Sequence, residues 1–551
     1  MQLHKLLLCT IMLFLVGCAT QRQQLKMNEG KEQFKQGNLK NMIASIEAAF
    51  PDKNALYYLE KGQTYRLLGP KDIPNSTQNF LLADQQVEKW EIETIDRISG
   101  SLNTIGSYFL AEGLSSNYDL KPYEMSLLSQ YLSLNHISQG KWNDAMVEAK
   151  KMAQREKIIE GFIQKKVVAI SDAQQNQQSN KKTRGSTTRI EEIDGYPVNL
   201  LDDDETRNLK NAYQNPSAYY LSGFIYESQG ETSLAAPGYR LALELRPSVA
   251  FFKSSLSNLE KNIKNKGKRD DADTLVIIDT GFIPKITPYK TNEVFNLGNG
   301  PKIVTLTLPV IEKSTETFTP TNVQIGSQVL RPELVTNVDA MARKNLQDEM
   351  PGYVLRATSR AITSLATQLA IDLYVARSAQ NEDNALAAAL TGAVASLMVG
   401  ATYQAINVTD ARHWSTLPSS TYMTRVNLPA GSNRISYATP SGAIQTQTVN
   451  LIPGYNVVYL RIFRDKGSVL SSNDPRALSS SPPAALTNEQ KVTVPASEGF
   501  FSGMLNSLMP STAAKSEPIS SPPEKVDNRK DMVQPPILDG ATQPVNNKDP
   551  Q

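Results

Sequence analysis

The sequence predicts a mainly α-helical N-terminal half, then an α+β region with antiparallel strands, and finally a disordered C-terminal tail. Three observations support this fold class. Small and aromatic residues recur at helical intervals before residue 260, apolar runs with a period of two follow residue 273, and the residues after 465 are rich in proline and lack tyrosine and tryptophan. We therefore expect a helical domain over residues 18–260, an α+β domain over residues 273–464 and a disordered tail over residues 465–551.

The first eighteen residues predict a lipid anchor. Lys5 precedes an apolar run that is too short to span a membrane as a mature helix, and Leu15-Val16-Gly17-Cys18 closes this run. These four residues resemble the bacterial lipobox, which implies that residues 1–17 are removed and that Cys18 carries lipid. Ala19, where an aspartate would signal retention in the inner membrane, implies the outer membrane, with the body in the periplasm. The alternative is an ordinary signal peptide with an incidental cysteine.

The most regular helical pattern lies in residues 216–248. Its positions are Tyr219, Gly223, Tyr226 and Gly230, followed by Ala235, Tyr239 and Pro247. This spacing predicts two short antiparallel helices: Gly223 allows close approach of the second helix, Gly230 turns the chain, and Pro247 ends the hairpin. The stretch resembles the tetratricopeptide repeat.

The same spacing recurs earlier in the chain. One copy has Tyr58, Gly62, Tyr65 and Gly69, with an insertion at Pro70–Asn75 that is expected to delay its second helix to about Phe80. A looser copy keeps Gly140, Trp142 and Ala145, and the weakest contains Gly30, Phe34 and Gly37. Because one hairpin cannot bury its apolar face alone, roughly three or more are expected to stack. Generic amphipathic helices are the alternative.

Two polar segments interrupt the helical half. Residues 171–190 are rich in glutamine and lack apolar periodicity, so we expect a flexible loop there. The acidic run Asp202–Glu205 could suggest calcium, but it lacks the spaced ligands and the turn glycine of a binding loop. Acidic residues that open a helix explain the run more simply, so we expect no metal.

Apolar runs in the second half predict its strands and helices. Residues 274–282, 302–311 and 322–330 are expected to be strands, and residues 338–379 a helix. The uncharged run 384–409 is interpreted as a buried helix, with a membrane-spanning helix as the alternative. Alternation between Tyr422 and Ile462 predicts four short strands in an antiparallel meander or a small sandwich.

The sequence favours binding over catalysis. With 57 basic and 55 acidic residues, there is no electrostatic reason to expect nucleic acid. The three histidines, His4, His136 and His413, do not form a metal pair, and no catalytic or phosphate-binding motif is present. Acidic pairs such as Asp271–Asp273 are interpreted as solvated. We therefore expect no enzymatic activity and no cofactor.

The arrangement as a whole resembles a family of uncharacterised Gram-negative lipoproteins with tetratricopeptide-like repeats and a C-terminal mixed α/β domain. The segments that carry the resemblance are Tyr57–Gly69, Tyr219–Tyr226 and Asp410–Pro418. It implies a scaffold in cell-envelope assembly that binds envelope proteins through its repeats. Gln63, Asn135 and Glu227, polar positions on the first helices, are the candidate groove residues. The alternative is a glycan- or peptidoglycan-binding lipoprotein that acts through the C-terminal β region.

Overall fold

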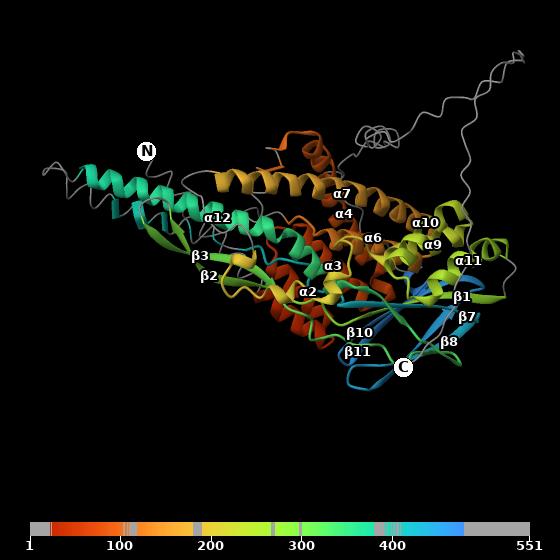
Figure 1. Cartoon of the computed structure of the whole chain (residues 1–551). Coiled ribbons are helices and arrows are strands. Elements are labelled where there is room, and N and C mark those ends of the chain that lie inside the picture. Colours follow the sequence, from red (N-terminus) through yellow and green to blue (C-terminus); the bar gives the residue numbers. More distant parts are fainter. Residues whose placement is uncertain are drawn as a thin grey trace, which may run out of the picture. The chain divides into compact units, whose positions relative to one another are not determined.

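The computed structural model describes residues 23, 25–102, 105–106, 108, 118–179, 190–265, 270–296, 300–378, 392–393, 395–397, 399–400, 403, 407 and 409–478 (Figure 1). Contacts divide the chain into two compact units, Met1–Ala484 and Ala485–Gln551, and every described residue belongs to the first. Cys18 and the predicted tail beyond residue 478 therefore lie outside the described residues.

The fold class is confirmed: paired helices precede a region of mainly antiparallel strands. The predicted hairpins are α3 (Ala55–Leu68) with α4 (Ile73–Ser99), α6 (Pro122–Ser138) with α7 (Trp142–Ser179), and α9 (Pro216–Gln229) with α10 (Thr232–Leu245). They are preceded by a helix over residues 25–35 and by α2 (Leu39–Ala49), and followed by α11 (Ala250–Lys264). Helix α9 shows the local signals clearly, because Asn215 caps its first turn and Gly230 ends it in the left-handed conformation.

Close packing within the hairpins explains their glycines. A Cβ atom at Gly62 would lie 2.5 Å from the Phe80 ring of α4, and one at Gly223 would lie 2.7 Å from the Tyr239 ring of α10. On the second helix, a Cβ atom at Gly238 would lie 2.7 Å from the Tyr219 carbonyl oxygen. Each glycine therefore removes a side chain where two helices touch.

Two helices extend beyond their predicted limits. Helix α4 begins at Ile73, directly after the 3₁₀ turn η1 (Pro70–Asp72), so the insertion does not delay it to Phe80. A proline in the first turn of a helix has no hydrogen bond to lose, which is why Pro74 is compatible with this start. Helix α7 continues to Ser179, so the first part of the predicted flexible loop is helical, and residues 180–189 lie outside the description.

The strands form three sheets. A five-stranded sheet has the order β11-β10-β1-β7-β6, a four-stranded sheet has the order β5-β4-β8-β9, and β2 pairs with β3. The strands are β1 (Asp271–Thr280), β2 (Ile286–Asn296), β3 (Pro301–Ile311), β4 (Gln324–Ile325), β5 (Gln328–Val329), β6 (Glu333–Asn337), β7 (Ser420–Pro429), β8 (Gly431–Ala438), β9 (Ile444–Leu451), β10 (Gly454–Phe463) and β11 (Lys466–Ser471). The central strand β1 is antiparallel to β7 and parallel to β10.

The five-stranded sheet has an apolar core on each face. Val276 and Ile278 of β1 pack in a core with Ile435 of β8 and Val449 of β9. The alternate residues of β1 belong to a second core, which also contains residues of every helical hairpin. The two sheets therefore form the sandwich that was predicted as an alternative to a meander, and the helices cover the outer face of the larger sheet (Figure 1).

Several elements of the second half differ from the sequence prediction. Strands β2 and β6 were not predicted, and β11 and α14 (Pro475–Leu478) lie where the disordered tail was expected to begin. Helix α12 (Val338–Ser378) agrees with its predicted range. Gly392 packs against Val375 of this helix, but Leu397 is 74% exposed, so the described residues of the run 384–409 are not those of a buried helix. Among the described helices, none combines the length and apolarity needed to span a bilayer.

Replacing Gly238 with alanine should destabilise the protein by about 2 kcal/mol, because its new Cβ atom would press on backbone atoms that cannot rotate away. Chemical denaturation of the Gly238→Ala variant measures this change. The matched control is Gly161→Ala in α7, where the Cβ atom would make an ordinary 3.5 Å contact with Ile98. That control should lose nothing or gain up to about 1 kcal/mol. Equal stability of the two variants would contradict the close packing of α9 with α10.

Candidate functional site at the face between helices and sheet

Strand β1 directs two carboxylates toward the helices. Side chains alternate along a strand, so Asp273 and Asp279 share a face with Leu275 and Ile277, which pack in the core shared with the helices. Both carboxylates are almost wholly buried, with 3% and 0% of the residue exposed. The interpretation of Asp271–Asp273 as a solvated pair is therefore wrong for Asp273. A buried carboxylate requires donors, and here they come from both halves of the chain.

The first cluster is centred on Arg425 of β7. Its guanidinium nitrogen Nη2 lies 2.7 Å from a carboxylate oxygen of Asp273 and 2.7 Å from one of Glu227 in α9. Nε and Nη1 complete paired contacts with the same two carboxylates, at 2.9 Å each. The hydroxyls of Tyr239 and Tyr455 also donate to Glu227. This cluster joins the last hairpin to three strands of the sheet, β1, β7 and β10.

The second cluster is centred on Asp279. One carboxylate oxygen accepts from the hydroxyls of Tyr131 in α6 and Tyr459 in β10, both at 2.8 Å. The other oxygen accepts from Thr421 of β7 at 2.5 Å. Asp279 therefore joins the middle hairpin to the sheet entirely through neutral hydroxyl donors.

The third cluster binds the segment Asp410–Pro418 to the first two hairpins. Glu60 of α3 accepts from the Ser415 amide at 2.6 Å and from the Thr416 hydroxyl at 2.7 Å, and Glu124 of α6 accepts from the Trp414 amide at 2.7 Å. Burial raises the pKa of Glu60 to about 7, even though its hydrogen bonds oppose the shift. Burial also raises the pKa of Glu124. The indole of Trp414 is fully buried against aromatic side chains from α4 and α6.

The three candidate groove residues lie on this same face, but they are not available to a foreign partner. Gln63, Asn135 and Glu227 each show 0% exposure. Asn135 donates to Ser76 and accepts from Arg66, and Glu227 pairs with Arg425. The prediction of an open groove at these positions is therefore wrong. The chain's own five-stranded sheet and the segment Asp410–Pro418 cover this face of the first helix of each hairpin.

The signature residues of the repeats fall within or beside the hairpins, where the spacing places them. The structure has Tyr58, Gly62 and Tyr65 in α3 and Gly69 after it, Gly140 before α7 with Trp142 and Ala145 in its first turn, Tyr219, Gly223 and Tyr226 in α9 with Gly230 after it, and Ala235 and Tyr239 in α10, with Pro247 shortly beyond. The signature residues within the helices pack these helices together, and Gly69, Gly140 and Gly230 lie in turns with positive φ. They do not converge on a reactive group.

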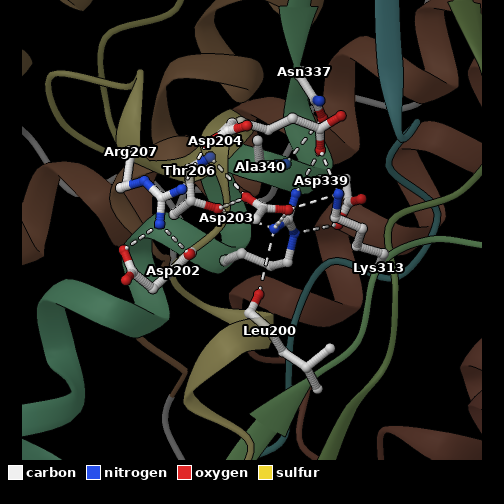
Figure 2. Close-up of polar contacts among 12 residues, drawn as sticks. Leu200, Asp202, Asp203, Asp204, Thr206, Arg207, Lys313, Asn337, Asp339 and Ala340 are labelled. Atoms are coloured by element: carbon white, nitrogen blue, oxygen red, sulfur yellow. Dashed lines mark hydrogen bonds and ion pairs between the residues drawn. The ribbon is translucent and has the colours of Figure 1, made fainter.

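The acidic run Asp202–Glu205 opens a helix, as its simpler interpretation predicts. Asp203 caps the short helix α8 (Asp204–Arg207) by accepting from the Thr206 amide at 2.9 Å. Its other oxygen lies 2.6 Å from Lys313 Nζ and 2.7 Å from Arg343 Nη1, and Figure 2 shows these polar contacts. Burial opposes the effect, but the bonds from Lys313 and Thr206 hold the pKa of Asp203 well below its usual range. In the described ranges, no group of three His, Cys, Asp or Glu side chains is placed to hold a metal ion.

Sequence reasoning missed the charged residues that matter most here. The available signal was a carboxylate or a guanidinium inside an otherwise apolar strand, as at Asp279 in β1, Arg425 in β7 and Arg461 in β10. Such a residue faces either water or a partner, and the alternation alone does not say which. Together the three clusters can hold the helices on the sheet, because the carboxylates in each cluster accept from fixed protein donors.

Removing the Arg425 guanidinium should destabilise the protein by about 3–5 kcal/mol, because Asp273 and Glu227 would remain buried without their shared cation. Chemical denaturation of Arg425→Met measures the loss. The control is Arg207→Met, whose side chain is 52% exposed and which should change stability little. If the two variants unfold at the same denaturant concentration, Arg425 does not hold the halves together.

Glu60 should give the stability a characteristic pH dependence. Its folded pKa of about 7 lies above its ordinary 4.5, so the stabilisation from protonated Glu60 is complete below about pH 4.5 and is lost as pH rises through 7. Relative to Glu60→Gln, the unsubstituted protein should lose up to about 3 kcal/mol over this window. Denaturation of both proteins from pH 4.5 to pH 8 tests the sign. A difference between them that does not vary with pH would contradict the burial of an ionisable Glu60.

Comparison with known proteins does not assign the site. No protein-family model, no curated protein and no solved structure matches the chain. The chemistry of the described residues is therefore the basis for a function. The first helices of the hairpins, α3, α6 and α9, are covered by other parts of the chain. The second helices, α4, α7 and α10, form an outer layer with exposed side chains.

Proposed function

We propose that this chain is an outer-membrane-anchored periplasmic lipoprotein that acts as a protein-binding scaffold in cell-envelope assembly, and that partners bind the outer layer of its repeats. The observation that carries this proposal is the contrast between the two helices of each hairpin. Every residue of α3, α6 and α9 is buried or half-buried. The second helices of the same hairpins are the ones that carry exposed aliphatic side chains.

The exposed aliphatic residues occur on all three second helices. Within the three hairpins they are Leu81 and Ile92 on α4, Val147, Val167 and Val168 on α7, and Leu234 on α10, with exposures of 37% to 57%. Outside the hairpins, exposed aliphatic residues also occur on the strands, such as Ile303 of β3 and Val329 of β5. Single exposed apolar residues are common, but their restriction to one helix of each hairpin is what supports a binding role. Helical-repeat proteins commonly bind partners through an extended surface built from successive repeats.

The N-terminal helix supports the proposed anchor. Phe34, in the helix over residues 25–35, packs against Phe282 and Phe463 with ring centroids 5.4 Å and 5.1 Å apart. Lys31 donates from Nζ to the Ile283 carbonyl at 3.2 Å. A lipid attached at Cys18 would therefore hold a firmly docked helix, and through it the whole body, at the membrane.

The glycan-binding alternative receives less support from the geometry. One face of the five-stranded sheet packs on the helices and the other on the four-stranded sheet, so both faces are used internally. A glycan would have to bind at strand edges or loops. Thr446 on the edge strand β9 is therefore a suitable crosslinking position for this alternative.

Photo-crosslinking in intact cells tests the proposal. A photoreactive amino acid at Val147 or Val167 should yield a covalent adduct with a discrete envelope protein, whereas the same group at exposed Thr446 of β9 should not. Val168→Asp, beside Val167, should reduce the Val167 adduct because it places a charge in an apolar contact. Immunoblotting and mass spectrometry of the adducts provide the readout.

The lipid anchor is tested in the same cells. Cys18→Ser should remove the protein from the outer-membrane fraction and leave it unprocessed and unlipidated, whereas Cys9→Ser, within the signal peptide, should leave it in place. Adducts formed only from Thr446, or retention on isolated peptidoglycan, would favour the glycan-binding alternative. Adducts absent from every position would count against the scaffold.

A further inference from the structure

Helix α3 presents a row of polar side chains to the interior. Glu60, Gln63 and Arg66 follow one another at intervals of three, which places them on one side of the helix. All three show 0% exposure. The segment that contains Thr416 lies opposite this row, since Glu60 accepts from the Thr416 hydroxyl.

Arg66 is buried with much of its donor capacity unused. Nη1 donates to the Asn135 side chain, and the guanidinium carbon lies 4.1 Å from the Tyr459 ring centroid and 5.3 Å from that of Tyr131. The nitrogens Nε and Nη2 have no hydrogen-bond partner among the described residues. The same holds for both polar atoms of the Gln63 amide.

Arg461 of β10 lies beside the same tyrosine. It is two residues beyond Tyr459, so both side chains point to the helical face of the sheet. Its nitrogen Nη2 makes only a long contact of 3.5 Å, with the Thr416 carbonyl, and its exposure is 0%. Nε and Nη1 have no acceptor within the described part of the chain.

The nearby carboxylates make no direct ion pair with these two cations. Asp279 is directly opposite Arg461 in the β1–β10 register, yet its oxygens accept from the hydroxyls of Tyr131, Tyr459 and Thr421. Glu60 accepts from Ser415 and Thr416. In the described ranges, neither guanidinium makes an ion pair with a carboxylate.

We propose that Arg66 and Arg461, with the Gln63 amide, form an internal site for a small oxyanion of the phosphate, sulfate or carboxylate type. Two guanidinium groups offer planar pairs of N–H donors that match the oxygens of such an anion. Water could accept the free hydrogen bonds, but it would bring no charge to either guanidinium, and a buried cation without a direct ion pair is costly. An oxyanion satisfies both requirements.

The surroundings limit the ligand to a small, free anion. The side chains of Gln63, Arg66 and Arg461 are all fully buried, so a bound group is enclosed between α3 and the sheet. Tyr459 supplies an aromatic face to Arg66, and Phe282 supplies one to Arg461 at 4.9 Å. Such faces attract a guanidinium cation without accepting the in-plane hydrogen bonds of its N–H groups. The anion would connect the first hairpin to β10.

Equilibrium dialysis of the purified full chain against radiolabelled inorganic phosphate tests the site. We expect saturable binding with a dissociation constant below about 1 mM, well below the concentrations at which phosphate stabilises proteins generally. Sulfate and acetate, each at the same ionic strength set with sodium chloride, should compete to different degrees and so identify the class of anion. Absence of saturable binding by the unsubstituted protein would overturn the proposal.

Variants assign the binding to these residues. Arg66→Gln and Arg461→Gln should each weaken phosphate binding by at least about tenfold, because each removes a charged hydrogen-bond donor. Arg207→Gln, at an exposed arginine, should leave binding unchanged. Gln63→Met keeps the size of the side chain and removes only its amide, so it provides a weaker-binding variant if the arginine variants do not fold. If Gln63→Met and every folded arginine variant bind phosphate as tightly as the unsubstituted protein does, the assignment is overturned.

Discussion

The carboxylates of β1 can be buried only if both halves of the chain supply donors to them. Asp273 shares Arg425 with Glu227 of the last hairpin, and Asp279 accepts from a tyrosine of the middle hairpin. A sheet folded without the helices would leave these charges either hydrated or unpaired, and the helices alone would lack their apolar cover. Because of this mutual requirement, the helices and the five-stranded sheet share one core, and the other features of the structure depend on their docking.

This docking changes which surface of the repeats is open to a partner. In an isolated array of helical hairpins, the layer of first helices would be accessible to other molecules. Here α3, α6 and α9 are enclosed, and the chain's own sheet supplies the strands that contact them. The ion pairs and hydroxyl hydrogen bonds at fixed positions then determine how the helices are oriented on the sheet. Burial of the shared apolar core supplies most of the free energy of this docking. The proposed scaffold would therefore bind partners through its outer helices, because its inner side is already covered by the sheet.

Local features were predictable from the sequence, and long-range pairings were not. The Tyr/Gly spacing found the hairpins because Gly62 and Gly223 meet partners only a short distance along the chain, and alternation found β7 to β10. Strand β2, with Lys290 and Glu293 among its residues, lacks a clear apolar alternation, and β11 is a short edge strand that depends on β10. The partnership of Asp273 with Arg425 joins residues 152 positions apart, and no local pattern marks it. The same limit led the candidate groove residues to be placed on an open face.

The docked N-terminal helix also limits the distance between the folded protein and a lipid attached at Cys18. Between Cys18 and the first turn of the helix at Leu25, the backbone can extend to at most about 25 Å. On a chain acylated at Cys18, as proposed, the docked helix would therefore begin within about 25 Å of the lipid, and the parts of the body packed against Phe34 would stay near the membrane.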